Sequence, residues 1–257
     1  YQWVKAVHGS EALKVYDFDI DAQGNIYATG IFWTSANYDT NDSREIVYGT
    51  NYYNKMYFKI TSEGEIDWFK QLDGIARYYN QSYGIKCSND GSLYLTGKIT
   101  GDLDLDAGPD KFVLNNYKDG QYYLLKTNLN GDFIWAKSFD NIEYRGLQIQ
   151  KSGNVLIGGE FKDSVEFGSG DDKLKAISSG NQDVYVLQLN SEGKYQNLFA
   201  FGGPGHDAFI DLDLFPSDEV LLTASFHDSV SINIPENNCV FSKDSADMAI
   251  IRLNKNL

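Results

Sequence analysis

Cysteine and histidine are scarce in this sequence, and each scarcity removes a class of protein. The two cysteines, Cys87 and Cys239, are too few for a disulfide framework, and we expect them to lie in different repeats and not to pair. The three histidines, His8, His206 and His227, form no His-Glu-x-x-His motif, which disfavours a zinc site. There is also no Gly-x-Ser-x-Gly elbow and no phosphate-binding loop. The sequence therefore offers no signature of these common enzyme classes, and we expect a protein that is not an enzyme.

Positive charge is scarce as well. The chain has 22 Lys and Arg against 36 Asp and Glu, a formal net charge of −14. Such a surface repels phosphate backbones and anionic lipids, which argues against nucleic-acid partners and direct membrane insertion. No apolar run approaches the roughly 20 residues that a spanning helix needs. Because the sequence begins at Tyr1 without methionine, we expect that an export signal or a longer N-terminal region has been removed. We expect the protein to be extracytoplasmic, secreted or surface-anchored, with a lipoprotein as one candidate form.

What the sequence does contain is one motif in four copies. Each copy starts at a turn residue, usually glycine, and continues as a mostly apolar strand, at residues 24–30, 91–97, 153–159 and 218–224. The copies recur about every 65 residues. Short alternating runs broken by Gly, Asn and Asp, without sustained helical spacing, are typical of a β-propeller or a β-solenoid.

Each repeat predicts four strands, which we name a to d in chain order. Strand a alternates apolar and polar residues, at 16–20, 83–87, 145–149 and 210–214. Strand b is apolar on both faces and is expected to be buried, at 26–32, 93–99, 155–161 and 220–226. Strand c is expected at 56–60, 123–127, 185–189 and 249–253. Strand d is expected at 68–72, 135–139 and 197–201.

The two ends of the chain each carry part of a repeat. The last repeat lacks strand d, whereas residues 1–7 match this strand, with Trp3 in the place of Trp135. A closed ring uses both fragments, because the N-terminal strand then completes the C-terminal blade and leaves no open edge. We therefore predict one all-β domain over 1–257, a β-propeller with four blades of four antiparallel strands and extra hairpins. The blades are expected at about 15–73, 82–140, 144–202 and 209–257 with 1–7.

The repeat also has a recognisable residue pattern. It reads Gly-Asn-x-Tyr-x-Thr-Gly, then an Asp-containing apolar pair, a strand c ending in lysine, and Gly-x-x-x-Trp-x-Lys. The second repeat fits best, whereas the third has Asn197 for the tryptophan and the fourth has Asp218 for the first glycine. This pattern resembles the bacterial β-propeller repeat of secreted and cell-surface proteins, often described as the seven-bladed propeller repeat. The resemblance covers nearly the whole chain and implies the fold, although only four copies are present, but it implies no reaction.

Aromatic residues gather in the long b–c and d–a connections, which share one face of the predicted ring. On a rigid scaffold such residues suit stacking on sugar rings or binding of a peptide. The alternative is that they cap the apolar ends of the blades. The candidate ligand-binding residues are Trp33, Tyr38, Tyr52, Tyr53, Tyr78, Tyr79 and Tyr117.

Polar residues of strand a are expected to line the ring axis. Four carboxylates from neighbouring first and last blades could hold a cation or act as an acid/base pair. The alternative is that they solvate a water-filled channel and pair with lysine. These candidate axial residues are Asp17, Asp19, Lys86, Gln148, Asp211 and Asp213.

A weaker metal candidate is the run Asp102, Asp104 and Asp106, which resembles the start of a calcium loop. A calcium loop needs glycine at its sixth position and glutamate at its twelfth, where this chain has Ala107 and Val113. The same alternation is typical of a half-exposed strand with Leu103 and Leu105 inward. We expect no cofactor, with calcium as the one alternative.

Three functions remain open. The first is a noncatalytic extracytoplasmic binding or scaffold module, monomeric, whose glycan or protein ligand meets the aromatic loop face. The second is a carbohydrate-active enzyme that uses carboxylates at the mouth of the channel. The third is a structural spacer within a surface protein.

Overall fold

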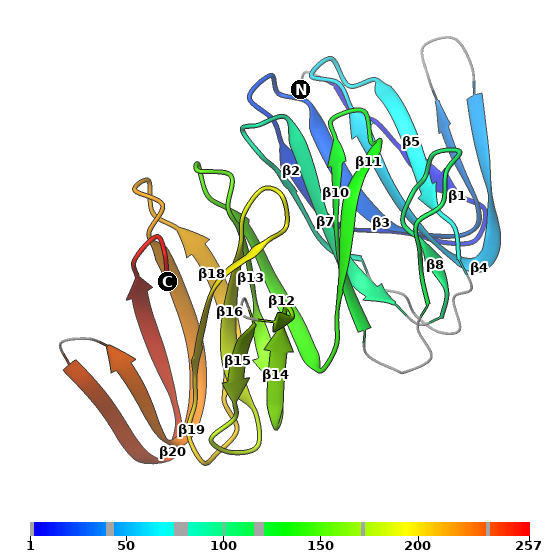
Figure 1. Cartoon of the computed structure of the whole chain (residues 1–257). Helices are drawn as coiled ribbons and strands as arrows, with labels where there is room; N and C mark the ends of the chain where they lie inside the picture. Colours follow the sequence, from blue (N-terminus) through cyan, green and yellow to red (C-terminus); the bar gives the residue numbers. More distant parts are fainter. Residues whose placement is uncertain are drawn as a thin grey trace. The chain divides into compact units, whose positions relative to one another are not determined.

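The computed structural model describes the chain except for residues 1–2, 40–43, 75–81, 100, 116–120, 171–172 and 235–236. The described residues form antiparallel strands joined by turns, with no helix among them (Figure 1). The all-β prediction is thus confirmed. In this part of the chain, no helix has the length and apolar character needed to cross a membrane.

The chain divides into two compact units, Tyr1–Ser138 and Phe139–Leu257. Each unit holds two of the four sequence repeats and has its own apolar cores. Strand b, which the repeat predicts to be buried, contributes residues to each core. The single four-bladed ring stays a prediction.

The first unit contains two main sheets. The first consists of β2 (Leu13–Ile20), β3 (Ile26–Asp39), β4 (Arg44–Ile60) and β5 (Ile66–Leu72), with β1 (Val7–Gly9) also paired to β3. The second consists of β6 (Ser82–Cys87), β7 (Ser92–Ile99), β10 (Gln121–Asn128) and β11 (Phe133–Phe139). A short hairpin of β8 (Leu103–Asp104) and β9 (Val113–Leu114) lies between β7 and β10 in the chain.

The second unit repeats this arrangement. The third sheet consists of β12 (Ile142–Ile149), β13 (Val155–Phe161), β16 (Asp183–Leu189) and β17 (Tyr195–Phe201), with a hairpin of β14 (Ser164–Phe167) and β15 (Leu174–Ile177). The fourth sheet consists of β18 (Ala208–Leu214), β19 (Val220–Ile234) and β20 (Asn237–Leu253). In the described part of the chain it therefore has three strands, where the other sheets have four or more.

The predicted strands a to d are present in the predicted order. Strand b is almost wholly buried in β7 and β13, as its two apolar faces require. The extra hairpins are also present. In the second and third repeats they are separate strand pairs, whereas in the first and fourth they are extensions of β3 with β4 and of β19 with β20.

The turn residue that opens each motif has one backbone conformation in all four repeats. Gly24, Gly91 and Gly153 have φ values of 82°, 80° and 85°, and Asp218 has a φ of 67°. Glycine adopts this left-handed region without steric cost, and aspartate tolerates it better than most residues. The replacement of glycine by Asp218 therefore keeps the turn that the repeat needs.

The tyrosine, lysine and tryptophan of the sequence pattern form a row across each of the first two sheets. Tyr27 pairs with Lys59, which pairs with Trp68 on the next strand. The Lys59 ammonium lies 6.0 Å from the centre of the Tyr27 ring, where a cation is attracted to the ring face. In the second sheet Lys126 lies 5.2 Å from the Tyr94 ring in the same way. The pattern thus specifies contacts between neighbouring strands.

The N-terminal segment makes its observed contacts with the first sheet. The Trp3 indole Nε1 donates a 3.0 Å hydrogen bond to the Ser62 carbonyl, and Lys5 forms a 3.1 Å ion pair with Glu65. β1 then pairs with residues 36–38 of β3. These contacts fasten the segment to the first sheet, because the turn after β4 supplies both an acceptor and a carboxylate. Its pairing with the last sheet stays a prediction.

Candidate functional site

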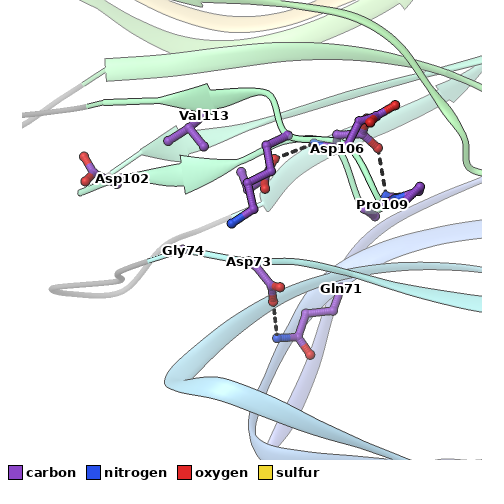
Figure 2. A pocket seen from close by; sticks show the side chains of 12 residues that line it. Gln71, Asp73, Gly74, Asp102, Asp106, Pro109 and Val113 are labelled. Atoms are coloured by element: carbon purple, nitrogen blue, oxygen red, sulfur yellow. Dashed lines mark hydrogen bonds between the residues drawn. The ribbon is translucent and has the colours of Figure 1, made fainter.

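A hollow of about 280 Å³ lies beside the β8–β9 hairpin in the first unit. Its lining includes Gln71 near the end of β5, Asp73 just after β5, and the carboxylates of Asp102, Asp104 and Asp106. Figure 2 shows Asp102 and Asp106 at opposite ends of the hollow, with Asp73 on the segment that faces them. The sequence therefore places several acids around one concave surface without directing them at one point.

Hydrogen bonds explain why these carboxylates do not converge. Asp104 Oδ1 accepts the backbone N–H groups of Asp106 (3.2 Å) and Phe112 (2.9 Å). Asp106 Oδ1 accepts the N–H of Gly108 (2.8 Å). Aspartate commonly shapes turns in this way, by bonding to backbone two residues ahead. Asp104 and Asp106 thus hold the loop that forms one wall of the hollow.

The carboxylates of this loop do not form a set of calcium ligands. Leu103 and Leu105 are buried, as the half-exposed strand interpretation expects. Among the residues that the structure describes, no group of three or more His, Cys, Asp or Glu side chains is placed to hold a metal ion. The hollow has a mixed lining, in which the carboxylates and Lys111 alternate with the apolar Ala107, Pro109 and Val113.

The aromatic residues of the first b–c connection lie on strands, so their expected position on loops is wrong. β3 and β4 simply continue through this connection as one long hairpin. Trp33 is buried and meets Tyr53 edge to face at 5.3 Å, and Tyr38 stacks on Phe69 at 5.1 Å. Trp33 and Tyr38 therefore pack the hairpin onto the sheet, in agreement with the capping alternative.

The remaining aromatic candidates are described only in part. Tyr52 lies on β4. Tyr78, Tyr79 and Tyr117 lie outside the described residues. Tyr48, on the same hairpin, is a large aromatic side chain with 73% exposure. Tyr48 is thus one aromatic side chain of this hairpin that the structure presents to solvent.

The axial candidates of the first unit act between its two sheets. Asp17 Oδ2 accepts the Ile85 N–H at 3.0 Å, and Asp19 Oδ2 accepts the Cys87 N–H at 2.7 Å. Both donors belong to β6, the edge strand of the second sheet, which also carries the half-buried Lys86. A carboxylate that accepts a backbone N–H forms a strong, charge-assisted bond. Asp17 and Asp19 thus join the edge of one sheet to the edge strand β2 of the other.

The axial candidates of the second unit divide into two kinds. Gln148 on β12 donates from Nε2 to the Leu212 carbonyl of β18 at 2.9 Å, so it also joins two sheets. Asp211 and Asp213 are exposed, and each accepts the N–H of the residue that follows it. The gathering of Asp17 and Asp19 with this second pair in one channel stays a prediction.

One further residue of this kind was not expected from the sequence. Glu160 is buried, and its Oε1 accepts the Phe209 N–H at 2.9 Å while its Oε2 binds Arg145 at 3.0 Å. The Phe209 ring fits where Gly158 leaves room, since a side chain there would come within 2.3 Å of it. An acid in an apolar strand b was the available signal, because buried carboxylates need partners.

Tryptophan makes a second kind of joint in the first unit. Trp68 Nε1 donates to the Leu129 carbonyl at 3.2 Å, and Lys70 pairs with Asp132 at 3.6 Å. Leu129 lies in the turn after β10, as Ser62 lies in the turn after β4. The contacts of Trp3 and Lys5 on the first sheet therefore repeat those of Trp68 and Lys70 on the second.

The second unit makes this joint with amides. Gln150 and Gln188 each donate from Nε2 to the Lys255 carbonyl at 2.8 Å, in the turn after β20. Asn197, which replaces the tryptophan of the pattern, donates to Gln188 Oε1 at 2.7 Å. A turn carbonyl is thus the acceptor in the first, second and fourth repeats, although the donor differs.

Two buried carboxylates mark the end of the third sheet. Asp183 accepts from the Ser178 hydroxyl and the Ser179 N–H, and Asp207 Oδ2 accepts the Gly203 N–H at 2.7 Å. Asp207 Oδ1 is buried and has no hydrogen-bond partner in the described structure. Burial, and next the charge of Asp183, raise the pKa of Asp207 above its ordinary value.

We expect Asp207→Asn to increase the free energy of unfolding at pH 7. The amide keeps an oxygen for Gly203 and removes the charge that faces Asp183. Because the native pKa is raised, the wild type loses stability as pH rises through that pKa, so the gain should disappear below about pH 4. Denaturant unfolding at both pH values measures this, with the exposed Asp140→Asn as control. An equal effect of Asp207→Asn at both pH values would contradict the argument.

Lys55 is a deeply buried charge-bearing side chain of the first unit. It is 2% exposed on β4, and its ammonium lies 5.5 Å from the centre of the Tyr123 ring. Burial lowers the pKa of Lys55 to about 7. A lysine of this kind costs stability in its charged form.

Comparisons with known proteins give a distant structural likeness. No protein-family model matches the sequence, and no curated protein matches it. Among solved structures, the chain is similar to a protein of unknown function from Bacteroides caccae, with a TM-score of 0.42 and 12% sequence identity. The match covers 96% of this chain and 63% of that one, so the chain spans less than two thirds of that protein's length.

Proposed function

We propose that this chain is a noncatalytic extracytoplasmic binding and scaffold module. One observation carries the proposal: the polar residues that the repeat places at corresponding positions fasten sheets together. Asp17 and Asp19 accept backbone N–H groups of the next sheet, and Gln148 donates to a backbone carbonyl. Carboxylates held in this way serve to position strands. The extracytoplasmic location rests on the resemblance of the repeat to that of secreted and surface proteins.

We propose further that the four sheets are blades of one propeller of that repeat type. The support is that the first three strands follow the same order in all four sheets and that two kinds of joint recur. Ser62, Leu129 and Lys255 accept at the same place in three repeats. In a propeller each blade meets the next through one repeated contact, as these joints do.

The ligand surface that we propose lies on the b–c hairpins of the first unit. Tyr48 supplies an exposed ring suited to stacking, and the hollow beside β8 supplies carboxylate oxygens for hydroxyl groups. A glycan or a protein strand could contact both Tyr48 and the hollow, because binding residues are commonly carried by segments that a rigid fold holds in place.

A glycan array, followed by a pull-down from cell-envelope extract, tests the function. We expect Tyr48→Ala to weaken binding to any hit at least tenfold, while the equally exposed Ile177→Ala on β15 leaves it unchanged. Release of reducing sugar from a bound glycan would contradict the noncatalytic assignment in favour of a carbohydrate-active enzyme. Failure of both screens would favour the structural spacer.

A further inference from the structure

Two of the chain's three histidines come together in the second unit. The rings of His206 and His227 lie nearly parallel, at an angle of 14°, with their centres 6.2 Å apart. His206 precedes β18, whereas His227 lies on β19, so the two residues are 21 positions apart in the sequence. Both residues are exposed. No short motif in the sequence therefore shows that these two imidazoles share one surface.

The connection that carries His206 is packed directly on β19. A side chain on Gly203 would collide with the Ser229 carbonyl, and one on Gly205 would collide with the His227 carbonyl. Glycine at both positions lets the backbone of the connection approach the backbone of the strand. This close packing holds the two histidines beside each other.

A backbone contact sets the tautomer of the His227 ring. Its Nδ1 lies 2.9 Å from the His206 carbonyl oxygen. A carbonyl oxygen can only accept, so the neutral ring donates from Nδ1 and has its lone pair on Nε2. Histidines that bind metal ions commonly donate their other ring N–H to a backbone carbonyl, which fixes the ring and makes the free nitrogen more basic. His227 thus has the tautomer and the support of a metal ligand.

The charge around the pair favours a cation. Asp228 follows His227 in the chain and is exposed, whereas Asp207 follows His206 and is buried. Oδ1 of Asp207 has no hydrogen-bond partner in the described structure. Carboxylates close to a surface attract a positive ion even where they do not bind it directly.

The spacing of the two rings suits a shared ion. Imidazole nitrogens bind zinc at about 2.0–2.1 Å, so two rings on one ion have their centres roughly 5–6.5 Å apart. The observed separation of 6.2 Å lies within this range. The ring of His206 is exposed and is able to turn toward an ion that His227 holds.

We propose that His206 and His227 bind a divalent transition-metal ion of the zinc or nickel type. Among the described residues no third His, Cys, Asp or Glu side chain is placed to join them, so water would fill the remaining positions. Imidazole suits these ions, whereas Mg²⁺ prefers oxygen ligands. The bound ion would tie the connection before β18 to β19. The site lies within the unit Phe139–Leu257 and does not depend on the binding function proposed above.

Isothermal titration calorimetry with Zn²⁺ and with Ni²⁺ tests the site. A Cys239→Ser background removes one competing thiol, and burial raises the pKa of the Cys87 thiol to about 12, which keeps it protonated. We expect His206→Ala and His227→Ala each to weaken binding at least tenfold, because each removes one of two ligands. His8→Ala removes the other exposed histidine and should leave the affinity unchanged. Mg²⁺ should give no binding that depends on the pair.

His227→Gln separates the ligand from the backbone contact. The glutamine amide retains an N–H donor for the His206 carbonyl but has no imidazole lone pair. We therefore expect this variant to fold as the wild type does, by circular dichroism, and to lose metal affinity as His227→Ala does. Wild-type affinity in His227→Gln would overturn the proposal.

Thermal unfolding gives a second readout. Excess Zn²⁺ should raise Tm of the wild type by a few degrees, because the ion binds the folded pair. The double variant His206→Ala/His227→Ala keeps His8 and should show no such rise. Equal affinity in the wild type and the double variant would assign the ion to other groups and overturn the proposal. Absence of Zn²⁺ and Ni²⁺ binding by the folded wild type would overturn it as well.

Discussion

Lys55→Met is expected to stabilise the protein most at slightly acidic pH. Burial lowers the native pKa of Lys55 to about 7 from its ordinary value of 10.5, so between these values the unfolded chain binds a proton that the native chain releases. Wild-type stability therefore rises with pH between these two values and is lost as pH falls toward 7. The advantage of the methionine variant should shrink by about 3 kcal/mol between pH 6.5 and 9.5.

Denaturant unfolding across this range measures the effect. The pH range stops at 9.5, below the ordinary pKa of tyrosine, because burial raises the pKa of Tyr27 and Tyr57 in the native state and their titration would add a second pH dependence. Lys59→Met removes a lysine of the same strand that pairs with Asp67 at the surface, and it serves as control. If Lys55→Met and Lys59→Met follow the same pH dependence, the buried amine is not the cause.

Trp68→Ala is expected to lower the free energy of unfolding of the first unit by roughly 3–5 kcal/mol. The indole packs between Tyr27 and Tyr57, with ring centres 6.2 and 5.6 Å away, and bonds the Leu129 carbonyl. Trp68→Phe keeps most of the packing and loses the donor, so it should cost about 1–2 kcal/mol. Circular dichroism during denaturant unfolding is the measurement.

Trp3 provides the matched comparison. It makes the same bond to the equivalent turn carbonyl but is 36% exposed, so Trp3→Ala should cost clearly less than Trp68→Ala. Equal losses of unfolding free energy in Trp3→Ala and Trp68→Ala would show that the deeper packing of Trp68 adds no stability. A loss of less than about 1 kcal/mol in Trp68→Ala would contradict the joint itself.

The strands and their order followed from the sequence because local chemistry determines them. Alternation, buried b strands and turn glycines act within a few residues, and Asp218 shows that even an altered turn keeps its backbone conformation. The extra hairpins followed for the same reason. The number of sheets in one ring concerns contacts between distant repeats, which no local pattern encodes.

The candidate sites were harder to predict for a related reason. Asp17 and Asp19 bond backbone N–H groups 68 residues away, and a backbone donor leaves no mark in the sequence. The sequence named Asp17 and Asp19 as candidates, but their role in joining two sheets could not be deduced from their residue type. Trp33 and Tyr38 were misplaced because a long aromatic connection and a long hairpin have the same composition.

The replacement at Asn197 shows how a repeat can diverge without losing its joint. An asparagine side chain is shorter than an indole. Asn197 therefore donates to Gln188, and Gln188, which also bonds Gln150, reaches the Lys255 carbonyl in its place. From the sequence, Asn197 indicated only a weaker repeat. The compensating glutamines lie on other strands, so they could be found only once the sheet register was known.

The same replacement determines what a spectroscopist would observe. The unit Tyr1–Ser138 contains all four tryptophans, Trp3, Trp33, Trp68 and Trp135. The unit Phe139–Leu257 contains none, since Asn197 stands at its tryptophan position. Indole fluorescence therefore reports the melting of the first unit alone, whereas far-ultraviolet circular dichroism reports both. Without any label, the gap between the two unfolding curves would measure how cooperatively the halves of the chain unfold.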